Sequence, residues 1–128
     1  MNEGLGLPRI LVADDEPALR ELVTVSLGDA AACDEAGDGD DALAKLETAD
    51  YDLVVLDLMM PGRSGMEVLR AIRADERLRS LPVLVMSAWQ SARESDEVLE
   101  AGANGFVPKP FKPEELVRAV RELLEAGT

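Results

Sequence analysis

Hydrophobic residues along the chain follow two alternating patterns: short continuous apolar runs and longer segments with helical spacing. The continuous runs, rich in β-prone residues, lie at 9–13, 53–56, 83–86 and, more briefly, 105–107. Runs of this length that are apolar at nearly every position are typical of strands buried on both faces of a parallel sheet. A weaker strand is predicted near residues 31–36, where Cys33 is the bulkiest apolar residue.

Each predicted strand is followed by a segment in which apolar residues recur every three or four positions. Pro17 suits the first turn of a helix, whose apolar face continues to Leu27 and whose predicted end is Gly28. Five strand–helix units in strict alternation predict one doubly wound α/β domain with a parallel sheet, filling residues 1–128. The other helices are predicted at about 40–48, around Met66, Leu69 and Ile72 after a turn at 61–65, at about 92–101, and after Pro113.

Composition narrows the chemistry available to this domain. The net charge of -13 argues against direct contact with nucleic acid, whose phosphates select for clustered lysine and arginine. The chain has no histidine, which excludes a Ser-His-Asp triad, a Cys-His pair and a histidine-ligated zinc site. No apolar run approaches the roughly 18 residues of a membrane-spanning helix, and the single cysteine, Cys33, cannot form an internal disulfide. We therefore expect a cytoplasmic protein without a membrane contact.

Polar residues stand at the carboxyl ends of four predicted strands. Ligands of doubly wound sheets bind outside these ends, and parallel strands bring the ends to one edge of the sheet. Any one of these residues taken alone is more often a turn former, a helix cap or a solvated charge. Together they form a set suited to a cation, because three converging carboxylates repel one another and their hard oxygen ligands favour Mg²⁺. The set comprises Asp14, Asp15, Asp57, Ser87 and Lys109.

The same set suits phosphoryl transfer. An aspartate carboxylate is a competent nucleophile toward phosphorus and gives an aspartyl phosphate. The negative charge that spreads over the phosphoryl oxygens in the transition state is commonly neutralised by Mg²⁺ and a lysine ammonium group. A serine hydroxyl can donate a hydrogen bond to a further oxygen of the phosphoryl group.

Four segments that carry these residues resemble a known family. They are LVADDEP (11–17), LVVLDLMMPGRSG (53–65), PVLVMSAW (82–89) and GANGFVPKPF (102–111). Together they closely resemble the receiver domains of bacterial two-component response regulators, over about residues 8–125. The resemblance implies a (βα)5 flavodoxin-like sandwich with a five-stranded parallel sheet in the order 2-1-3-4-5.

The resemblance also assigns a role to each site residue. It implies a phosphoacceptor that shifts the domain to an active state, and a signalling domain rather than an ordinary enzyme. A separate sensor histidine kinase or histidine phosphotransfer protein is the implied donor. The peptide between Lys109 and Pro110 is expected to be cis. The assignments are Asp57 as acceptor, Ser87 and Lys109 as contacts of the phosphoryl group, and Asp14, Asp15, Asp57 and the Met59 carbonyl as ligands of Mg²⁺.

Three further expectations follow from the resemblance. Phe106 matches an aromatic position that turns inward after phosphorylation, although an ordinary core aromatic would occupy the same place. The fourth helix, fifth strand and fifth helix form the expected output face for a downstream partner or a phosphorylation-dependent homodimer. Met59 and Trp89 flank the approach to the phosphoryl group and are expected to shield it, while Trp89 is equally consistent with docking a partner. Acidic residues of the fourth helix (Glu94, Asp96, Glu97 and Glu100, beside Arg93) favour a basic or mixed partner, although a solvated helix would carry the same residues.

Two other functions share part of the pattern. A haloacid-dehalogenase-type enzyme also uses a nucleophilic aspartate with Mg²⁺, but it needs a second aspartate two residues later, where this chain has Met59. A flavodoxin-like binder of nucleotide or flavin needs a phosphate-cradling loop after the first strand, where Asp14 and Asp15 repel phosphate unless a metal intervenes. A receiver that has lost phosphoryl acceptance is disfavoured because its site residues are all present.

Overall fold

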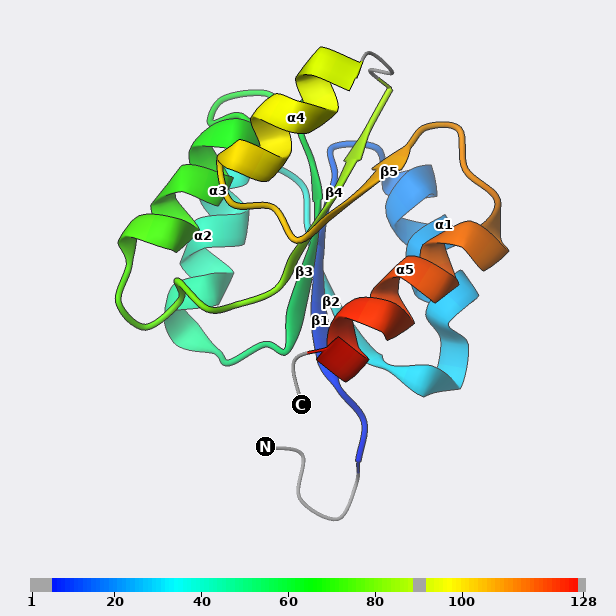
Figure 1. The fold of residues 1–128 in the computed structure, drawn as a ribbon. Helices are drawn as coiled ribbons and strands as arrows, with labels where there is room; N and C mark the ends of the chain where they lie inside the picture. Colours follow the sequence, from blue (N-terminus) through cyan, green and yellow to red (C-terminus); the bar gives the residue numbers. More distant parts are fainter. Residues whose placement is uncertain (1–5, 89–91, 127–128) are drawn as a thin grey trace.

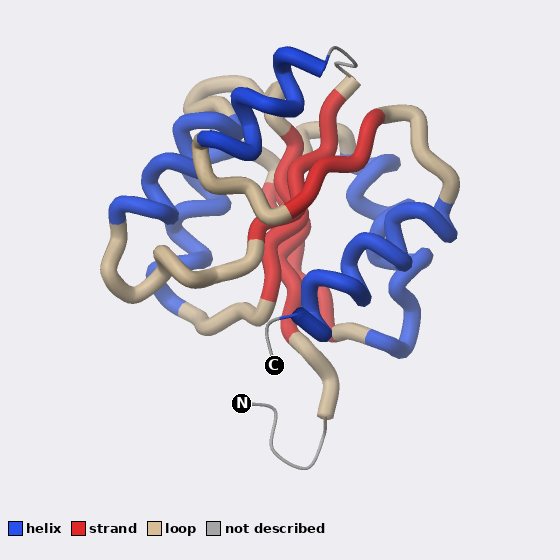
Figure 2. Tube along the Cα trace, viewed as in Figure 1, coloured by secondary structure: helices blue, strands red, loops and turns tan. Residues whose placement is uncertain are grey.

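One parallel sheet lies between two layers of helices. The computed structural model of the protein describes residues 6–88 and 92–126, without the side chains of residues 92–95. Five parallel strands pair in the order β2-β1-β3-β4-β5. Helices α1 and α5 cover one face and α2, α3 and α4 cover the other (Figure 1), so that the strands form a central layer (Figure 2). The predicted fold class and strand order are confirmed.

The elements follow the predicted alternation. The strands are β1 (Arg9–Ala13), β2 (Ala32–Ala36), β3 (Leu53–Asp57), β4 (Val83–Ser87) and β5 (Gly105–Pro108). The helices are α1 (Pro17–Leu27), α2 (Gly39–Thr48), α3 (Gly65–Ala74), α4 (Ala92–Glu100) and α5 (Pro113–Ala126). Helix α1 ends at Gly28 as predicted, and the short 3-10 helix η2 (Gly28–Ala30), which the prediction lacks, turns the chain toward β2. In the described part of the chain, no helix combines the length and apolarity that crossing a membrane requires.

The central strands are buried on both faces, which explains their continuous apolar runs. Leu11 and Ala13 of β1 pack into the cluster under α2, α3 and α4, whereas Ile10 and Val12 pack into the cluster under α1 and α5. All five residues of β3 (Leu53–Asp57) are buried. Because side chains alternate between the faces of a strand, both layers must be filled with apolar side chains at every position.

The edge strand β2 is less buried and carries the single cysteine. Cys33 is a free thiol, partly buried against the cluster under α1 and α5. Burial and the nearby charges of Asp34 and Glu35 raise the pKa of this thiol. The neutral thiol is therefore the favoured form, as expected for a packing residue rather than a reactive thiolate.

Side-chain caps fix the starts of α2 and α3. The Asp38 side chain accepts a hydrogen bond of 2.7 Å from the Asp41 amide at the start of α2. At the start of α3, the Ser64 hydroxyl accepts from the Glu67 amide and the Glu67 carboxylate accepts from the Ser64 amide. This capping box satisfies two amide donors that no intrahelical carbonyl can reach, and it fixes where the chain enters α3 after the loop that follows Asp57.

Candidate functional site

The predicted site residues gather at the carboxyl edge of the sheet. Asp14 and Asp15 follow β1, Asp57 and Ser87 end β3 and β4, and Lys109 follows β5. These positions come from four different strands, far apart in sequence. Parallel pairing of the strands is what brings them to one edge.

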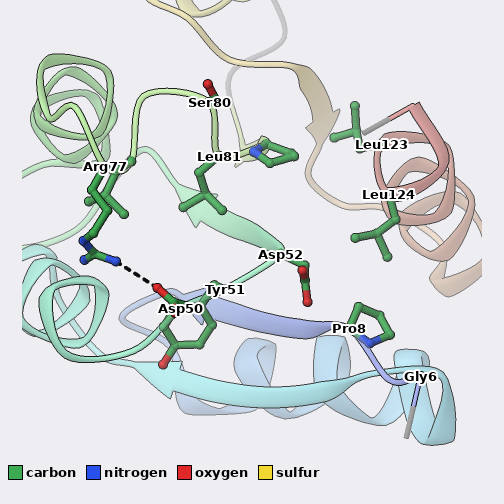
Figure 3. Close-up of a pocket in the computed structure, with 12 residues that line it drawn as sticks. Gly6, Pro8, Asp50, Tyr51, Asp52, Arg77, Ser80, Leu81, Leu123 and Leu124 are labelled. Atoms are coloured by element: carbon green, nitrogen blue, oxygen red, sulfur yellow. Dashed lines mark hydrogen bonds and ion pairs between the residues drawn. The ribbon is translucent and has the colours of Figure 1, made fainter. Parts of the chain in front are cut away.

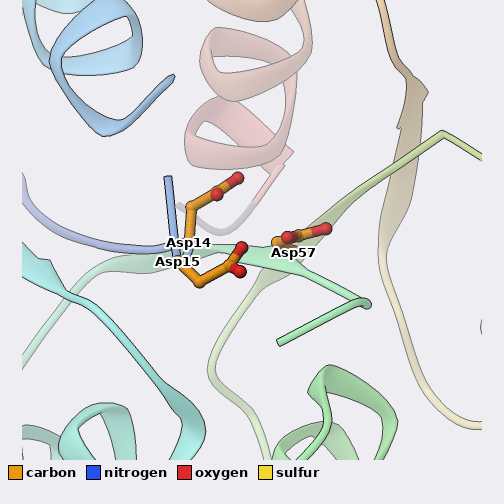
Figure 4. Close-up of side chains that lie close together, drawn as sticks. All are labelled: Asp14, Asp15 and Asp57. Atoms are coloured by element: carbon orange, nitrogen blue, oxygen red, sulfur yellow. The ribbon is translucent and has the colours of Figure 1, made fainter. Parts of the chain in front are cut away.

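Three carboxylates converge there. Asp14, Asp15 and Asp57 each offer an oxygen within 4.8 Å of the others (Figure 4). Asp14 and Asp57 are buried, at 0% and 2% exposed, whereas Asp15 is exposed. Backbone amides orient the two buried groups, because the Glu16 amide donates to Asp14 Oδ1 at 2.8 Å and the Met59 amide donates to Asp57 Oδ1 at 3.2 Å.

Lys109 lies between the two buried carboxylates. Its Nζ is 3.0 Å from Asp14 Oδ2 and 3.3 Å from Asp57 Oδ1, and its side chain is 16% exposed. Burial alone would lower the lysine pKa, but the hydrogen bond to Asp14 and the charge of Asp57 outweigh it and raise the pKa. The ammonium form therefore persists at neutral pH. The Lys109 amide donates to the Ser87 carbonyl at 2.7 Å, and the Lys109–Pro110 peptide is cis as predicted.

The charge balance at this edge favours a further cation. Burial, followed by the negative charge of Asp14, raises the pKa of Asp57 despite the opposing effect of Lys109. One lysine thus does not fully compensate three neighbouring carboxylates. All-oxygen donors and one solvent-exposed carboxylate fit a hard cation such as Mg²⁺, which retains several water ligands in protein sites. The residues present therefore fit the predicted metal.

Two predicted contacts remain predictions. Ser87 is fully buried at the end of β4, on the same edge as the carboxylates, but its contact with a phosphoryl group is not tested by this geometry. Met59 contributes its amide to Asp57, and the proposed role of its carbonyl as a metal ligand is likewise untested. Met59 is 58% exposed. Trp89, predicted to shield the site with it, lies outside the described residues.

The expected output face is described only in part. Phe106 lies opposite Val85 in the pairing of β4 and β5 and packs, partly buried, against the core under α2, α3 and α4. In α4 the residues Asp96, Glu97 and Glu100 are exposed, as predicted for an acidic surface. The side chains of Arg93 and Glu94 lie outside the described part of the helix.

Gly65 packs against the backbone of Asp57, a contact that the sequence did not indicate. The turn-rich segment predicts a glycine for chain reversal, but a Cβ at Gly65 would lie 2.1 Å from the carbonyl oxygen of Asp57. The start of α3 thus approaches the backbone of Asp57 too closely for any side chain at position 65. No local pattern indicates such a contact, because it depends on how α3 packs against the end of β3.

Gly65→Ala is expected to lower the free energy of unfolding by about 3 kcal/mol, since the backbone on both sides must shift. Urea unfolding measures this loss. Gly62→Ala is the matched control in the same turn: its φ is +70° but a Cβ would meet nothing within 4 Å. The free energy of unfolding of Gly62→Ala is expected to fall by about 1 kcal/mol, because alanine is strained in a left-handed backbone conformation. Equal losses in the two variants would contradict the close-approach argument.

Comparison with known protein families identifies the domain. The model of the response regulator receiver domain family matches residues 10–121, from β1 into α5. The chain belongs to this family. Being a receiver domain places it among the response regulators of two-component signalling, as the four sequence segments indicate.

Individual relatives agree with this assignment. The receiver domain is 39% identical over 119 residues to the chemotaxis protein CheY of Pseudomonas aeruginosa, covering 91% of this chain and 96% of that protein. It is 43% identical over 117 residues to the DNA-binding response regulator MtrA of Mycolicibacterium smegmatis, covering 91% of this chain and 50% of that protein. The chain thus spans nearly all of the first relative and about half of the second.

Solved structures show the same fold. The structure of the chemotaxis response regulator CheY4 of Vibrio cholerae superposes with a TM-score of 0.87 at 31% identity, covering 91% of this receiver domain and 98% of that chain. The structure of a putative response regulator from Chloroflexus aurantiacus gives a TM-score of 0.88 at 28% identity, covering 93% and 98%.

Proposed function

We propose that this receiver domain is a phosphoryl-accepting switch in which Asp57 takes a phosphoryl group from a phosphohistidine donor. The observation that carries the proposal is the position of Lys109, whose Nζ contacts both buried carboxylates at the edge where strand ends converge. A buried carboxylate beside a fixed cation is arranged for nucleophilic attack on a negatively charged phosphoryl group.

In the proposed reaction, an Asp57 carboxylate oxygen forms a bond to phosphorus while the phosphorus–nitrogen bond of the donor breaks. The electron pair of that bond stays with the imidazole nitrogen. Lys109 offsets the negative charge on the phosphoryl oxygens, and the Ser87 hydroxyl donates to one of them. Asp14, Asp15, Asp57 and the Met59 carbonyl would hold Mg²⁺, which supplies further positive charge when it is bound.

The donor in this proposal is a separate protein, because the chain contains no histidine. A sensor histidine kinase or a histidine phosphotransfer protein of the same cytoplasm fits this requirement. The output would pass through the α4-β5-α5 face to a partner, an attached domain or a second copy of the chain. Because the domain modifies its own Asp57 and releases no separate product, we class it as a signalling domain rather than an enzyme.

A nucleotide or flavin binder is less well supported. Such ligands bind outside the carboxyl ends of the strands, where this chain places carboxylates. A pocket of about 500 Å³ lies instead at the amino ends, beside residues that precede β1, β3 and β4 (Figure 3). There Arg77 pairs with Asp50 at 3.1 Å, so its charge is already partly neutralised.

The direct test is intact-mass analysis of the wild-type protein after incubation with acetyl phosphate. With Mg²⁺ present, we expect one adduct of the mass of a phosphoryl group, stable in acid and labile in base, that peptide mapping assigns to Asp57. A chelator in place of Mg²⁺ is expected to prevent the adduct. An adduct at another residue, or one that forms equally with the chelator, would overturn the proposed role of the site.

A further inference from the structure

Arg20 of α1 connects the acidic loop, residues 14–16 between β1 and α1, to the end of β2. Its Nη1 donates to the Asp14 carbonyl oxygen at 2.7 Å, and its Nε donates to Glu35 Oε1 at 2.9 Å. The arginine side chain is only 18% exposed. Two donors of one rigid guanidinium group therefore hold the loop after β1 against the neighbouring strand.

The contacted carbonyl belongs to the peptide that joins Asp14 to Asp15. That peptide is planar, so fixing its oxygen also fixes the direction in which the chain leaves toward Asp15. On the other side of the residue, the Asp14 amide donates to the Ala36 carbonyl at 3.0 Å. The backbone of Asp14 is thus held at both its amide and its carbonyl.

Asp15 depends on this backbone for its direction. Unlike Asp14 and Asp57, its carboxylate is exposed and makes no hydrogen bond or ion pair with the part of the chain that the structure describes. Its oxygen nevertheless lies within 4.8 Å of those of Asp14 and Asp57. Backbone placement, rather than a side-chain contact, therefore brings Asp15 into the cluster.

We propose that Arg20 is a positioning residue for the cation site: it fixes the Asp14–Asp15 peptide so that both carboxylates converge with Asp57. The inference rests on the proposed function, in which these carboxylates hold Mg²⁺. Arg20 itself touches neither the metal nor the phosphoryl group in this account. Because Arg20 already orders the acidic loop in the metal-free protein, binding of the metal does not have to order it.

Electrostatics alone predicts that loss of Arg20 changes the affinity for Mg²⁺ in the opposite direction. Removing a positive charge near three carboxylates leaves them more negative and should tighten the binding of a cation. Loss of positioning should weaken binding, and removing residues that orient metal ligands typically lowers affinity by about 10–100-fold. A change in the dissociation constant of Mg²⁺ therefore separates the two effects by its direction.

The experiment is calorimetric titration of Mg²⁺ into the full chain, with urea unfolding in Mg²⁺-free buffer as a second measurement. Arg20→Met is expected to raise the Mg²⁺ dissociation constant by about tenfold. Arg20→Lys keeps the charge but cannot bridge both acceptors, so we expect a smaller rise of about threefold. If Arg20→Met fails to fold, Arg20→Lys carries the test.

Arg9→Met is the matched control. Arg9 also pairs with a β2 carboxylate, Asp34, at 2.9 Å, but it lies at the amino end of β1 and packs over the Tyr51 ring. The Arg9→Met substitution removes the same charge and a similar ion pair but leaves the contacts of the acidic loop intact. We expect some loss of stability in this control and an unchanged Mg²⁺ dissociation constant.

The outcomes distinguish this inference from the proposed function. If the wild type binds Mg²⁺ and Arg20→Met binds it as tightly or more tightly, the positioning role is overturned and the metal site stands. Equal weakening in Arg20→Met and Arg9→Met would also overturn it, because the effect would then be general. If the wild type itself binds no Mg²⁺, the proposed function fails first.

Discussion

Asp57→Asn is expected to abolish the phosphoryl adduct that we predict for the wild-type domain. A neutral amide is a far weaker nucleophile than a carboxylate. The other buried carboxylate of the proposed site, Asp14, is assigned to the metal and is not expected to replace Asp57. The variant should still fold, because the asparagine side chain has nearly the same shape and its carbonyl oxygen can accept the Met59 amide. Intact-mass analysis with acetyl phosphate and Mg²⁺, followed over time, measures the loss.

The same variant should be more stable than the wild type in Mg²⁺-free buffer at neutral pH. Burial and the charge of Asp14 raise the pKa of Asp57, so the folded state binds this proton more tightly than the unfolded state does. The stability linked to this group is present below its ordinary pKa and is lost as the pH rises through the raised value. Removing the charge should recover on the order of 1 kcal/mol at pH 7.

Urea unfolding at several pH values checks this sign. The advantage of Asp57→Asn over the wild type should shrink as the pH falls and Asp57 becomes protonated. Asp50→Asn is the matched control, since Asp50 has 97% of its side chain exposed and lies at the opposite edge of the sheet. It should change stability by less than about 0.5 kcal/mol. A wild type more stable than Asp57→Asn at neutral pH without Mg²⁺ would contradict the argument.

Much of the fold was predictable because burial determines the apolar pattern. The run Leu53–Leu56 predicts a strand buried on both faces, and β3 is buried at every position. The periodic residues after Pro17 and Pro113 likewise mark α1 and α5. The strand at 31–36 gave a weaker signal because β2 lies at the edge of the sheet, where the acidic residues Asp34 and Glu35 interrupt the apolar pattern. The strand order came from the resemblance and not from the pattern itself.

The candidate site was predictable in its members but not in its contacts. Position at a strand end places Asp14, Asp57 and Lys109 on one edge, whatever the details of packing. That Lys109 reaches both carboxylates depends on the path of the chain after β5, which no local pattern encodes. The contacts of Arg20 and Gly65 with backbone carbonyls depend in the same way on how α1 and α3 pack against the sheet.

Lys109→Met is expected to lower stability more than any other substitution of a charged site residue. Two buried carboxylates lose the cation between them, and an uncompensated buried charge typically costs about 3–5 kcal/mol. Because the pKa of Lys109 is raised, its stabilising contribution is fully present at neutral pH and is lost only as the pH rises beyond its ordinary value. We expect a loss of about 3 kcal/mol in Mg²⁺-free buffer at pH 7, measured by urea unfolding.

Mg²⁺ should stabilise Lys109→Met more than it stabilises the wild type, because the metal and the lysine compensate the same carboxylates. Even with saturating Mg²⁺, the rate of phosphorylation of Lys109→Met should be about 10²-fold lower than that of the wild type. The variant lacks the ammonium group that would donate to the phosphoryl oxygens. Lys112→Met removes the same charge from an exposed position three residues along and should change stability by less than about 0.5 kcal/mol. If the two lysine variants unfolded at the same urea concentration without Mg²⁺, Lys109 would not be the cation that stabilises the acidic site.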